Sequence, residues 1–96
     1  MSRFRLLPAA LADLAEIRDY IAEHNPAAAA AMLERIEDRC RFFARFPGAG
    51  RNRADIRPGL HSFVVGRHVV FYRRGEAAID IVRVLHGARD IEAIVG

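Results

Sequence analysis

Histidines and arginines in the second half of the chain are the residues whose chemistry could act on a phosphodiester. Cleaving RNA through its own 2′-hydroxyl needs a general base, a general acid, and cations that stabilise the charged phosphorane. Imidazole can supply the first two groups and guanidinium the third. The candidates for these roles are His61, His68, His86, Arg67, Arg73, Arg83 and Arg89. The competing interpretation is structural, because a histidine on an exposed strand can simply bond a backbone carbonyl.

Two of these histidines flank a predicted tight turn. His61 and His68 lie on either side of Gly66-Arg67, so we expect the two imidazoles to approach each other across a hairpin. His24 stands apart, just before Asn25-Pro26 at a predicted helix end, where a histidine is compatible with the helix dipole. We interpret His24 as a surface residue.

The basic residues are unevenly distributed, and all fifteen of them are arginines. Six lie between Arg51 and Arg74, where Asp55 is the single acid, whereas the segment from Pro8 to Phe46 has seven acids and five arginines. Guanidinium offers a planar fork of donors that matches phosphate and carboxylate and stacks on flat rings. The clustering predicts that the middle of the chain faces an acidic partner or a nucleic acid. A GC-rich genome, replacing lysine by arginine on ordinary surface, would explain the missing lysines as well, but not the clustering.

Several enzyme classes lack their motifs in this sequence. There is no glycine-rich phosphate loop of the Walker type, no His-Glu-x-x-His and no Gly-x-Ser-x-Gly, and Ser2 and Ser62 are the only serines. The single cysteine, Cys40, forms neither an internal disulfide nor a zinc site by itself, and we expect it to be a buried thiol. The break at Asn25-Pro26 joins long helices, unlike a DNA-reading helix pair. We therefore predict no metal, no cofactor and no catalytic residue of these classes.

The chain has 96 residues, 52% of them hydrophobic, which suffices for one core, so residues 1–96 are predicted to form a single domain. Its first segment shows no apolar core of secretory type, since Pro8, Asp13, Glu16 and Asp19 interrupt it. No stretch approaches the roughly 20 apolar residues that cross a bilayer. We expect a cytoplasmic protein.

A short strand and two helices are predicted for the first half of the chain. Arg3 to Leu7 is apolar-rich and ends at Pro8, which favours a strand. Beyond Pro8, apolar residues recur three and four apart, and the acids stay off that stripe: Leu11, Leu14, Ile17 and Ile21 against Asp13, Glu16, Asp19 and Glu23. Asn25-Pro26 predicts the end of this helix and the start of a second one, with Asn25 as the cap and Pro26 in the first helical turn. The second helix carries a seam typical of an antiparallel hairpin, made of Ala29, Leu33, Ile36, Cys40 and Phe43.

Three strands are predicted for the second half. Phe46-Pro47-Gly48 ends the second helix, and a loop rich in glycine and arginine runs to Gly59. The strands are Leu60 to Val65, His68 to Arg73 and Ala77 to Leu85, separated by turns at 66–67 and 74–76. The last strand has apolar residues on both faces, which predicts a central position: Ile79 and Ile81 on one face, Val82 and Val84 on the other. A short apolar tail with Ile91, Ile94 and Val95 follows. The order β-α-α-β-β-β predicts an α+β fold, with the helical hairpin on one face of an antiparallel sheet.

The whole chain from Phe4 to Val95 resembles the RelE/ParE superfamily of bacterial type II toxins. The resemblance rests on the order and spacing of six segments: Leu7 to Leu14, Ile17 to Ile21, Phe46 to Arg51, Arg57 to Phe63, Phe71 to Arg73 and Arg83 to Asp90. It implies a helical hairpin packed on a curved antiparallel sheet, which agrees with the predicted order of helices and strands. It also implies a toxin that an antitoxin holds inactive in the cell.

Two activities occur in this superfamily, and the RelE-like one is a nuclease. That branch cuts messenger RNA in the ribosomal decoding site with basic residues on the sheet and a C-terminal aromatic. By motif, its two strand lysines fall here near Leu60 and Ser62, and the arginine of its next strand falls at Val69, so only its C-terminal arginine is matched, by Arg89. No Phe, Tyr or Trp follows Tyr72 to match the aromatic. If the chain is nevertheless an endoribonuclease, its site would consist of Arg67, His68, His86 and Arg89.

The ParE-like branch is the better match, through the segment His86 to Asp90 and the long helical hairpin. Its members are described as inhibitors of DNA gyrase that block replication and need no catalytic residues. The alternatives are the ribosome-dependent endoribonuclease and a non-toxic binding module. The resemblance also implies a ParD-like antitoxin, with a DNA-binding N-terminal part and a flexible, acidic C-terminal segment that folds on the toxin. We expect antitoxin or target to bind beside the apolar groove of the hairpin, at Arg67, Arg73, Arg83, His86 and Arg89.

Overall fold

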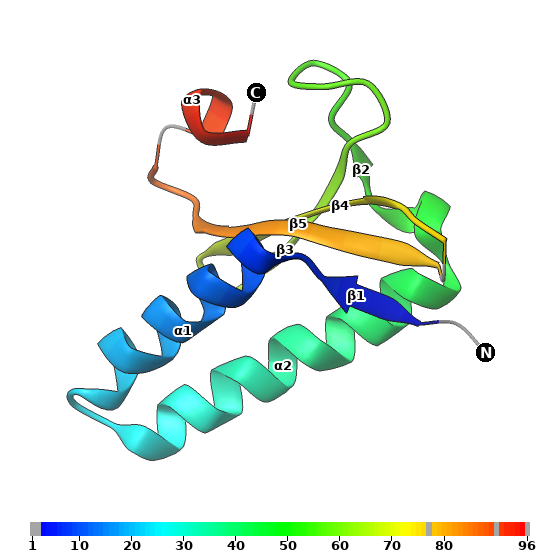
Figure 1. Ribbon diagram of the computed structural model, residues 1–96. Coiled ribbons are helices and arrows are strands. Elements are labelled where there is room, and N and C mark those ends of the chain that lie inside the picture. Colours follow the sequence, from blue (N-terminus) through cyan, green and yellow to red (C-terminus); the bar gives the residue numbers. More distant parts are fainter. Residues whose placement is uncertain (1–2, 77, 90, 96) are drawn as a thin grey trace.

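A helical hairpin and a five-stranded sheet form two layers in the computed structural model, which describes residues 3–76, 78–89 and 91–95 (Figure 1). The helices are α1 (Pro8–Ala22), α2 (Pro26–Arg45) and α3 (Ile91–Val95), with a 3₁₀ turn at Pro47–Ala49. The strands are β1 (Phe4–Leu6), β2 (Arg51–Asn52), β3 (His61–Val65), β4 (His68–Arg74) and β5 (Ile79–His86). The α+β fold is thus confirmed, with the short β2 and α3 as additions. Ala77 and Asp90, which the predicted strand and motif included, lie outside the described residues.

The two helices begin and end where the proline and asparagine signals predict. Pro8 opens α1 after an extended Leu7, since its fixed φ suits the first helical turn and it has no N–H to leave unpaired. Asn25 is extended and its side chain accepts the N–H of Ala28 at 3.0 Å, which caps α2. α2 ends at Arg45, before Pro47, and the two helices run antiparallel (Figure 1).

The sheet has the strand order β1-β5-β4-β3-β2. β2 to β5 pair antiparallel with their neighbours, whereas β1 pairs parallel with β5, because the helical hairpin returns the chain between them. β5 therefore has a strand on both sides, which confirms its predicted central position. β2 pairs only with His61 and Ser62, so the rest of the outer edge of β3 has no strand beside it among the described residues.

A β-bulge lies near the middle of β5. Opposite the single step from Phe71 to Tyr72 in β4, β5 takes two steps, from Arg83 to Ile81. The extra residue reverses the alternation of side chains beyond it. Val84 consequently joins Ile79 and Ile81 in the core between the helices and the sheet. The expectation that Val84 shares a face with Val82 was wrong, because period-two counting assumes an uninterrupted strand.

The main core lies between the helical hairpin and the sheet. It contains the buried residues Ala10, Ile36, Cys40, Phe43, Ala44, Phe63, Val65, Val70, Tyr72, Ile79, Ile81 and Val84. Cys40 is buried as expected, and burial, with a smaller effect of Glu37, raises the pKa of its thiol to about 12. The predicted stripe of α1 was wrong at one end: Leu11 is 53% exposed, whereas Asp13 is only 5% exposed.

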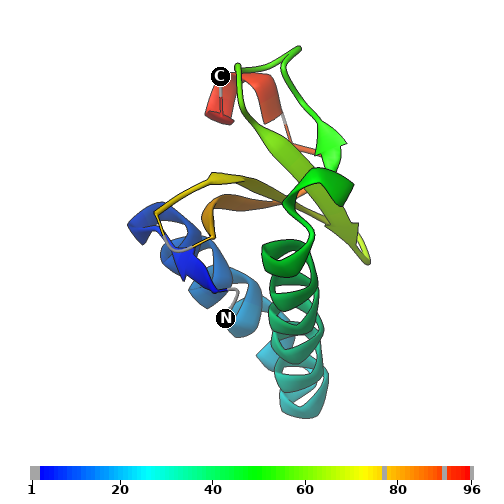
Figure 2. The same ribbon diagram turned by 90° about the vertical axis from the view of Figure 1, so that its right-hand side faces the viewer.

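A second, smaller core covers the other face of the sheet. Leu60, Phe71, Leu85 and Val95 are buried there, and Ile56, Ile91 and Ile94 pack against them. Figure 2 shows α3 and the loop before β3 together on the side of the sheet away from the hairpin. The apolar tail is therefore a short helix that shields this face from water. Among the described residues, no helix combines the length and hydrophobicity needed to span a bilayer.

Candidate functional site

A cleft of about 660 Å³ opens between the helical hairpin and the ends of β4 and β5. It brings together all four residues proposed for a nuclease site: Arg67, His68, His86 and Arg89. The rest of its lining comes mainly from the helices: Glu16, Ile17, Tyr20, Ile21, Met32 and Gly66. The sequence therefore identified the residues of the strand-side wall, whereas for the hairpin side it predicted an apolar groove without naming the residues of α1 and α2 that line it.

Strand register and one turn position the strand-side wall. Gly66 has φ of +59°, a left-handed conformation that glycine adopts without strain, and it lets β3 return directly as β4. His68 then pairs with His86 across the β4–β5 ladder. The N–H of Gly87 donates to the carbonyl oxygen of Arg67 at 2.9 Å, which ties the end of β5 to the turn. These backbone contacts hold the four side chains together where β4 begins and β5 ends.

The two histidines of the cleft form an edge-to-face pair. Their ring centroids are 5.7 Å apart with an interplanar angle of 85°. Nδ1 of His86 accepts the N–H of Ala88 at 3.1 Å, while Nδ1 of His68 is buried and has no hydrogen-bond partner among the residues that the structure describes. Burial lowers the pKa of His68, and the neighbouring His86 lowers it further. The neutral form of His68 is therefore favoured.

His61 does not belong to this pair, so the expected approach of His61 to His68 was wrong. In the β3–β4 hairpin His61 pairs with Tyr72, whereas Val65 pairs with His68, which separates the two histidines along the strands. The His61 ring stacks on Tyr72 with centroids 5.5 Å apart, and its Nδ1 lies 3.3 Å from the carbonyl oxygen of Gly59. This matches the structural interpretation, in which the histidine bonds a backbone carbonyl.

The helical wall of the cleft is mostly apolar and the opposite wall is cationic. Ile17, Ile21 and Met32 are half-buried and contribute aliphatic surface, and Tyr20, 76% exposed, contributes an aromatic ring. Within residues 3–76, 78–89 and 91–95, the guanidinium groups of Arg67 and Arg89 have no carboxylate partner. The cleft can therefore receive an apolar group that carries carboxylates or phosphates beside it.

Arg83, another predicted binding residue, is held in an ion pair outside the cleft lining. Its Nε and Nη2 donate to the two carboxylate oxygens of Asp13 at 2.7 and 2.8 Å, and the N–H of Val84 donates to the same carboxylate at 2.9 Å. The hydrogen bonds that Arg83 donates to Asp13 are the main cause that raises the pKa of Arg83. Asp13 was missed from the sequence because it was placed on the solvent side of α1. The pairing of β1 with β5 ends at Leu6, and beyond that point the Asp13 carboxylate accepts a backbone N–H of β5.

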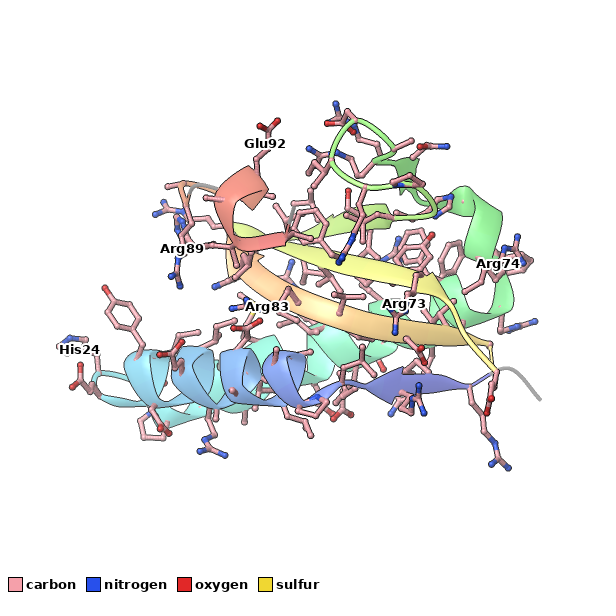
Figure 3. All side chains as sticks on the ribbon, turned by 45° about the horizontal axis from the view of Figure 1, so that its top comes forward. His24, Arg73, Arg74, Arg83, Arg89 and Glu92 are labelled. Carbon is pink, nitrogen blue, oxygen red and sulfur yellow. The ribbon has the colours of Figure 1, made fainter. Side chains whose placement is uncertain are left out.

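Arg73 lies at the other end of the sheet. Its Nε is 3.6 Å from the buried carboxylate of Asp80, which also accepts two hydrogen bonds from Arg5 at 3.1 Å. Figure 3 shows Arg89 towards the end of the molecule that carries His24, Arg83 between β5 and α1, and Arg73 and Arg74 towards the opposite end. The five predicted binding residues thus separate: Arg67, His86 and Arg89 share the cleft, while Arg73 and Arg83 do not.

The positions at which the resemblance places the strand cations of the RelE-like branch are buried or half-buried in this chain. Leu60 and Ser62 are each 3% exposed, and Val69 packs against the second core. The sheet therefore presents no cation at these three positions to stabilise a phosphorane. In the described part of the chain, no group of three or more His, Cys, Asp or Glu side chains is placed to hold a metal ion.

Comparisons with known proteins find relatives named as ParE toxins and one named Toxin RelE2, of Caulobacter vibrioides, which is 38% identical over 81 residues, covering 83% of this chain and 89% of that one. The family described as "ParE toxin of type II toxin-antitoxin system, parDE" matches residues 4–91. Toxin ParE1 of Mycobacterium tuberculosis is 39% identical over 93 residues, which cover 95% of each chain, and Toxin ParE3 of Caulobacter vibrioides is 37% identical over 79 residues, covering 82% of this chain and 79% of that one. A solved structure, "Chromosomal ParDE TA system from P. aeruginosa", superposes with a TM-score of 0.74 at 21% identity, covering 90% of this chain and 96% of that chain. This structural match shows a shared fold.

Proposed function

The chain belongs to the ParE toxin family of type II toxin-antitoxin systems, and on that premise we propose that it inhibits DNA gyrase and blocks replication until a ParD-like antitoxin neutralises it. Membership of the family implies an antitoxin partner. The choice of gyrase, and of a ParD-like partner, is the proposal. The site that would carry the antitoxin contact is the cleft with Arg67, His86 and Arg89.

The single observation that favours gyrase over the ribosome is the apolar character of the sheet face. A ribosome-dependent nuclease stabilises the phosphorane with strand cations. Here Leu60 and Val69 occupy such positions and pack into the second core, and Ser62 is buried and uncharged. α3, moreover, contains no aromatic side chain that could stack on a base. An inhibitor that acts by binding needs none of these groups.

The chemistry of the cleft supports an acidic, amphipathic antitoxin segment. Aliphatic side chains of Ile17, Ile21 and Met32 would bury its apolar anchors, and the guanidinium groups of Arg67 and Arg89, which have no carboxylate partner among the described residues, would receive its carboxylates. Contacts at Arg73 and Arg83 stay a prediction. Both guanidinium groups already contact carboxylates of this chain, so substitutions there would change stability as well as binding.

The test is to add purified protein to gyrase with relaxed plasmid DNA, and separately to translating ribosomes. We expect loss of supercoiling and accumulation of cleaved DNA complexes, with messenger RNA left intact. Preincubation with the cognate antitoxin should restore supercoiling. Unchanged supercoiling over a range of toxin concentrations that arrests growth in cells would refute gyrase as the target.

One observation keeps the nuclease alternative open: Arg67, His68, His86 and Arg89 do share one cleft. If this site cuts RNA, the variants His68→Gln and His86→Gln should abolish codon-phased cleavage on ribosomes. If gyrase is the target, the same variants should arrest growth without any change in messenger RNA. A chain that causes no growth arrest when expressed without antitoxin would instead be a non-toxic binding module.

A further inference from the structure

A second exposed surface lies on the C-terminal half of α2 and on the residue that follows it, away from the cleft. It consists of Arg39, Phe42, Arg45 and Phe46, which we call the aromatic–arginine surface. Phe42 is 39% and Phe46 49% exposed, although large apolar side chains are usually buried in a small domain. Their spacing of three and four residues places them on one side of the helix. The cleft, in contrast, is lined by the other end of α2, at Met32.

The rings and guanidinium groups of this surface alternate at short distances. The centroids of Phe42 and Phe46 are 5.2 Å apart. The guanidinium carbon of Arg39 lies 4.7 Å from the centroid of Phe42, and that of Arg45 lies 5.5 Å from the centroid of Phe46. Each cation thus rests against an aromatic ring, in the range of a cation–π contact.

The surface is anchored to the core below it. Phe42 contacts Phe43 edge to face, with centroids 5.0 Å apart, and Phe43 stacks on Phe63 of β3 at 4.2 Å. The phenyl rings are therefore held in place before any partner arrives. Rings that are already ordered lose little conformational entropy on binding.

The charge of the surface is positive because nearby acids are engaged elsewhere. Arg41 pairs with Glu37 at 3.3 Å and with Asp38 at 2.7 Å. Within the described part of the chain, Arg39 and Arg45 have no carboxylate partner. The complementary partner is consequently an anion with flat apolar groups.

We propose that the aromatic–arginine surface binds single-stranded DNA. Bases stack on phenyl rings and on guanidinium planes, and this stacking accepts any base. The donors at the edge of each guanidinium group remain free for the phosphates. An acidic peptide would use only those edge donors, whereas a single strand uses both the planes and the edges. A duplex keeps its bases stacked on one another and so cannot use the rings. The choice of DNA over RNA rests on the proposed action on gyrase.

The experiment measures fluorescence anisotropy of a labelled fifteen-nucleotide deoxythymidine strand, titrated with the full-length protein in the absence of gyrase. The duplex of the same length, a uridine ribo-strand and an acidic amphipathic peptide serve as competitors. We expect the deoxy strand to bind at least as tightly as the ribo-strand and more tightly than the duplex. Tighter binding of the ribo-strand or the duplex, or binding of the acidic peptide alone, would overturn the proposal.

Two variants and a matched control locate the site. Arg39→Gln with Arg45→Gln should weaken binding and lower the slope of log affinity against log salt by about 1.4, because each phosphate contact to a single strand contributes about 0.7. Phe42→Leu with Phe46→Leu keeps apolar surface but removes the rings, and should weaken binding about tenfold. The control, Arg18→Gln with Arg57→Gln, also removes two exposed charges and should retain most of the affinity.

Thermal unfolding of each variant separates loss of binding from loss of fold. The arginine variants change only exposed side chains, so they test the site even if the phenylalanine variants are unstable. Equal losses in the arginine variants and in the control would mean that net charge alone attracts the strand, and would refute this surface. Because gyrase is absent, failure here leaves the proposed gyrase inhibition untouched, and failure to inhibit gyrase leaves this binding intact.

Discussion

Two groups of arginines near β5 have opposite surroundings. Arg83 places its guanidinium group on the buried carboxylate of Asp13, while Arg67 and Arg89 line a cleft without such a partner in the described residues. The difference lies in what faces each side chain from distant parts of the chain. The residue type alone therefore does not reveal whether an arginine stabilises the fold or is available to a partner.

The physical cost of disturbing the two groups should differ accordingly. A buried carboxylate that loses its cation keeps the desolvation penalty without the compensating attraction. An exposed guanidinium group without a partner has no such contact to lose. Five substitutions in four experiments, ordered by their expected effect on stability, test this contrast.

Asp13→Ala should have the largest effect, a loss of about 3 kcal/mol in the free energy of unfolding. It leaves Arg83 without its carboxylate and the N–H of Val84 without an acceptor. Urea denaturation measures the loss. Asp19→Ala is the control, because Asp19 is exposed and pairs only with exposed Arg18, and it should change stability by less than about 0.5 kcal/mol. Similar losses in the two variants would contradict the structural role of Asp13.

Asp80→Asn should have a smaller effect, about 1 kcal/mol. Asp80 is buried, but the side chains of its partners Arg5 and Arg73 are 60% and 52% exposed, so solvent weakens both contacts. The loss should shrink further at 1 M salt, where exposed charges are screened, while the loss in Asp13→Ala should persist. The same denaturation series at two salt concentrations measures both. If the loss of stability in Asp80→Asn did not change with salt, its ion pairs would be as well shielded from solvent as the ion pair of Arg83.

His68 in the cleft should make the free energy of unfolding depend on pH. Since the pKa of His68 is lowered by burial and by His86, the unfolded chain binds its proton at a higher pH than the folded one. Stability that is present above about pH 6.5 is then lost as the pH falls through the folded-state pKa. His68→Gln should flatten this part of the curve of unfolding free energy against pH. A curve equally steep in His68→Gln and in the unsubstituted protein would place the dependence on other groups.

Arg67→Gln and Arg89→Gln should have the smallest effect on stability, within about 0.5 kcal/mol. Each should nevertheless weaken binding of the cognate antitoxin about tenfold, because a charge-assisted hydrogen bond is lost. Calorimetric titration measures the affinity, and unfolding of the free protein measures stability. Unchanged affinity in both variants would remove the cleft as the antitoxin site.

Local sequence signals were sufficient for the elements but not for their long-range partners. Asn25-Pro26 marked the helix break, since capping and proline act within one turn. Asp13 was misplaced because helical periodicity reports a face and not the strand that meets that face. The pairing of His68 with His86, and not with His61, depends on the register of two ladders that no single segment encodes. For the same reason, the sequence predicted an apolar groove at the hairpin but not which residues of α1 and α2 line it.

The bulge in β5 lets the strand carry one extra residue without changing the faces of its neighbours. Val82 has no partner in β4, and the residues on either side of it pair as they would if it were absent, Arg83 with Phe71 and Ile81 with Tyr72. A β5 that kept Val82 but lacked the bulge would alternate strictly, and every side chain from Arg83 to the end of the strand would turn to the opposite face. Leu85 would then enter the layer between the sheet and the helices, and Val84 would leave it. Both faces of the sheet are apolar, so hydrophobicity alone would not forbid that register. The carboxylate of Asp13, which accepts hydrogen bonds from Arg83 and from the N–H of Val84, favours the bulged register from outside the strand.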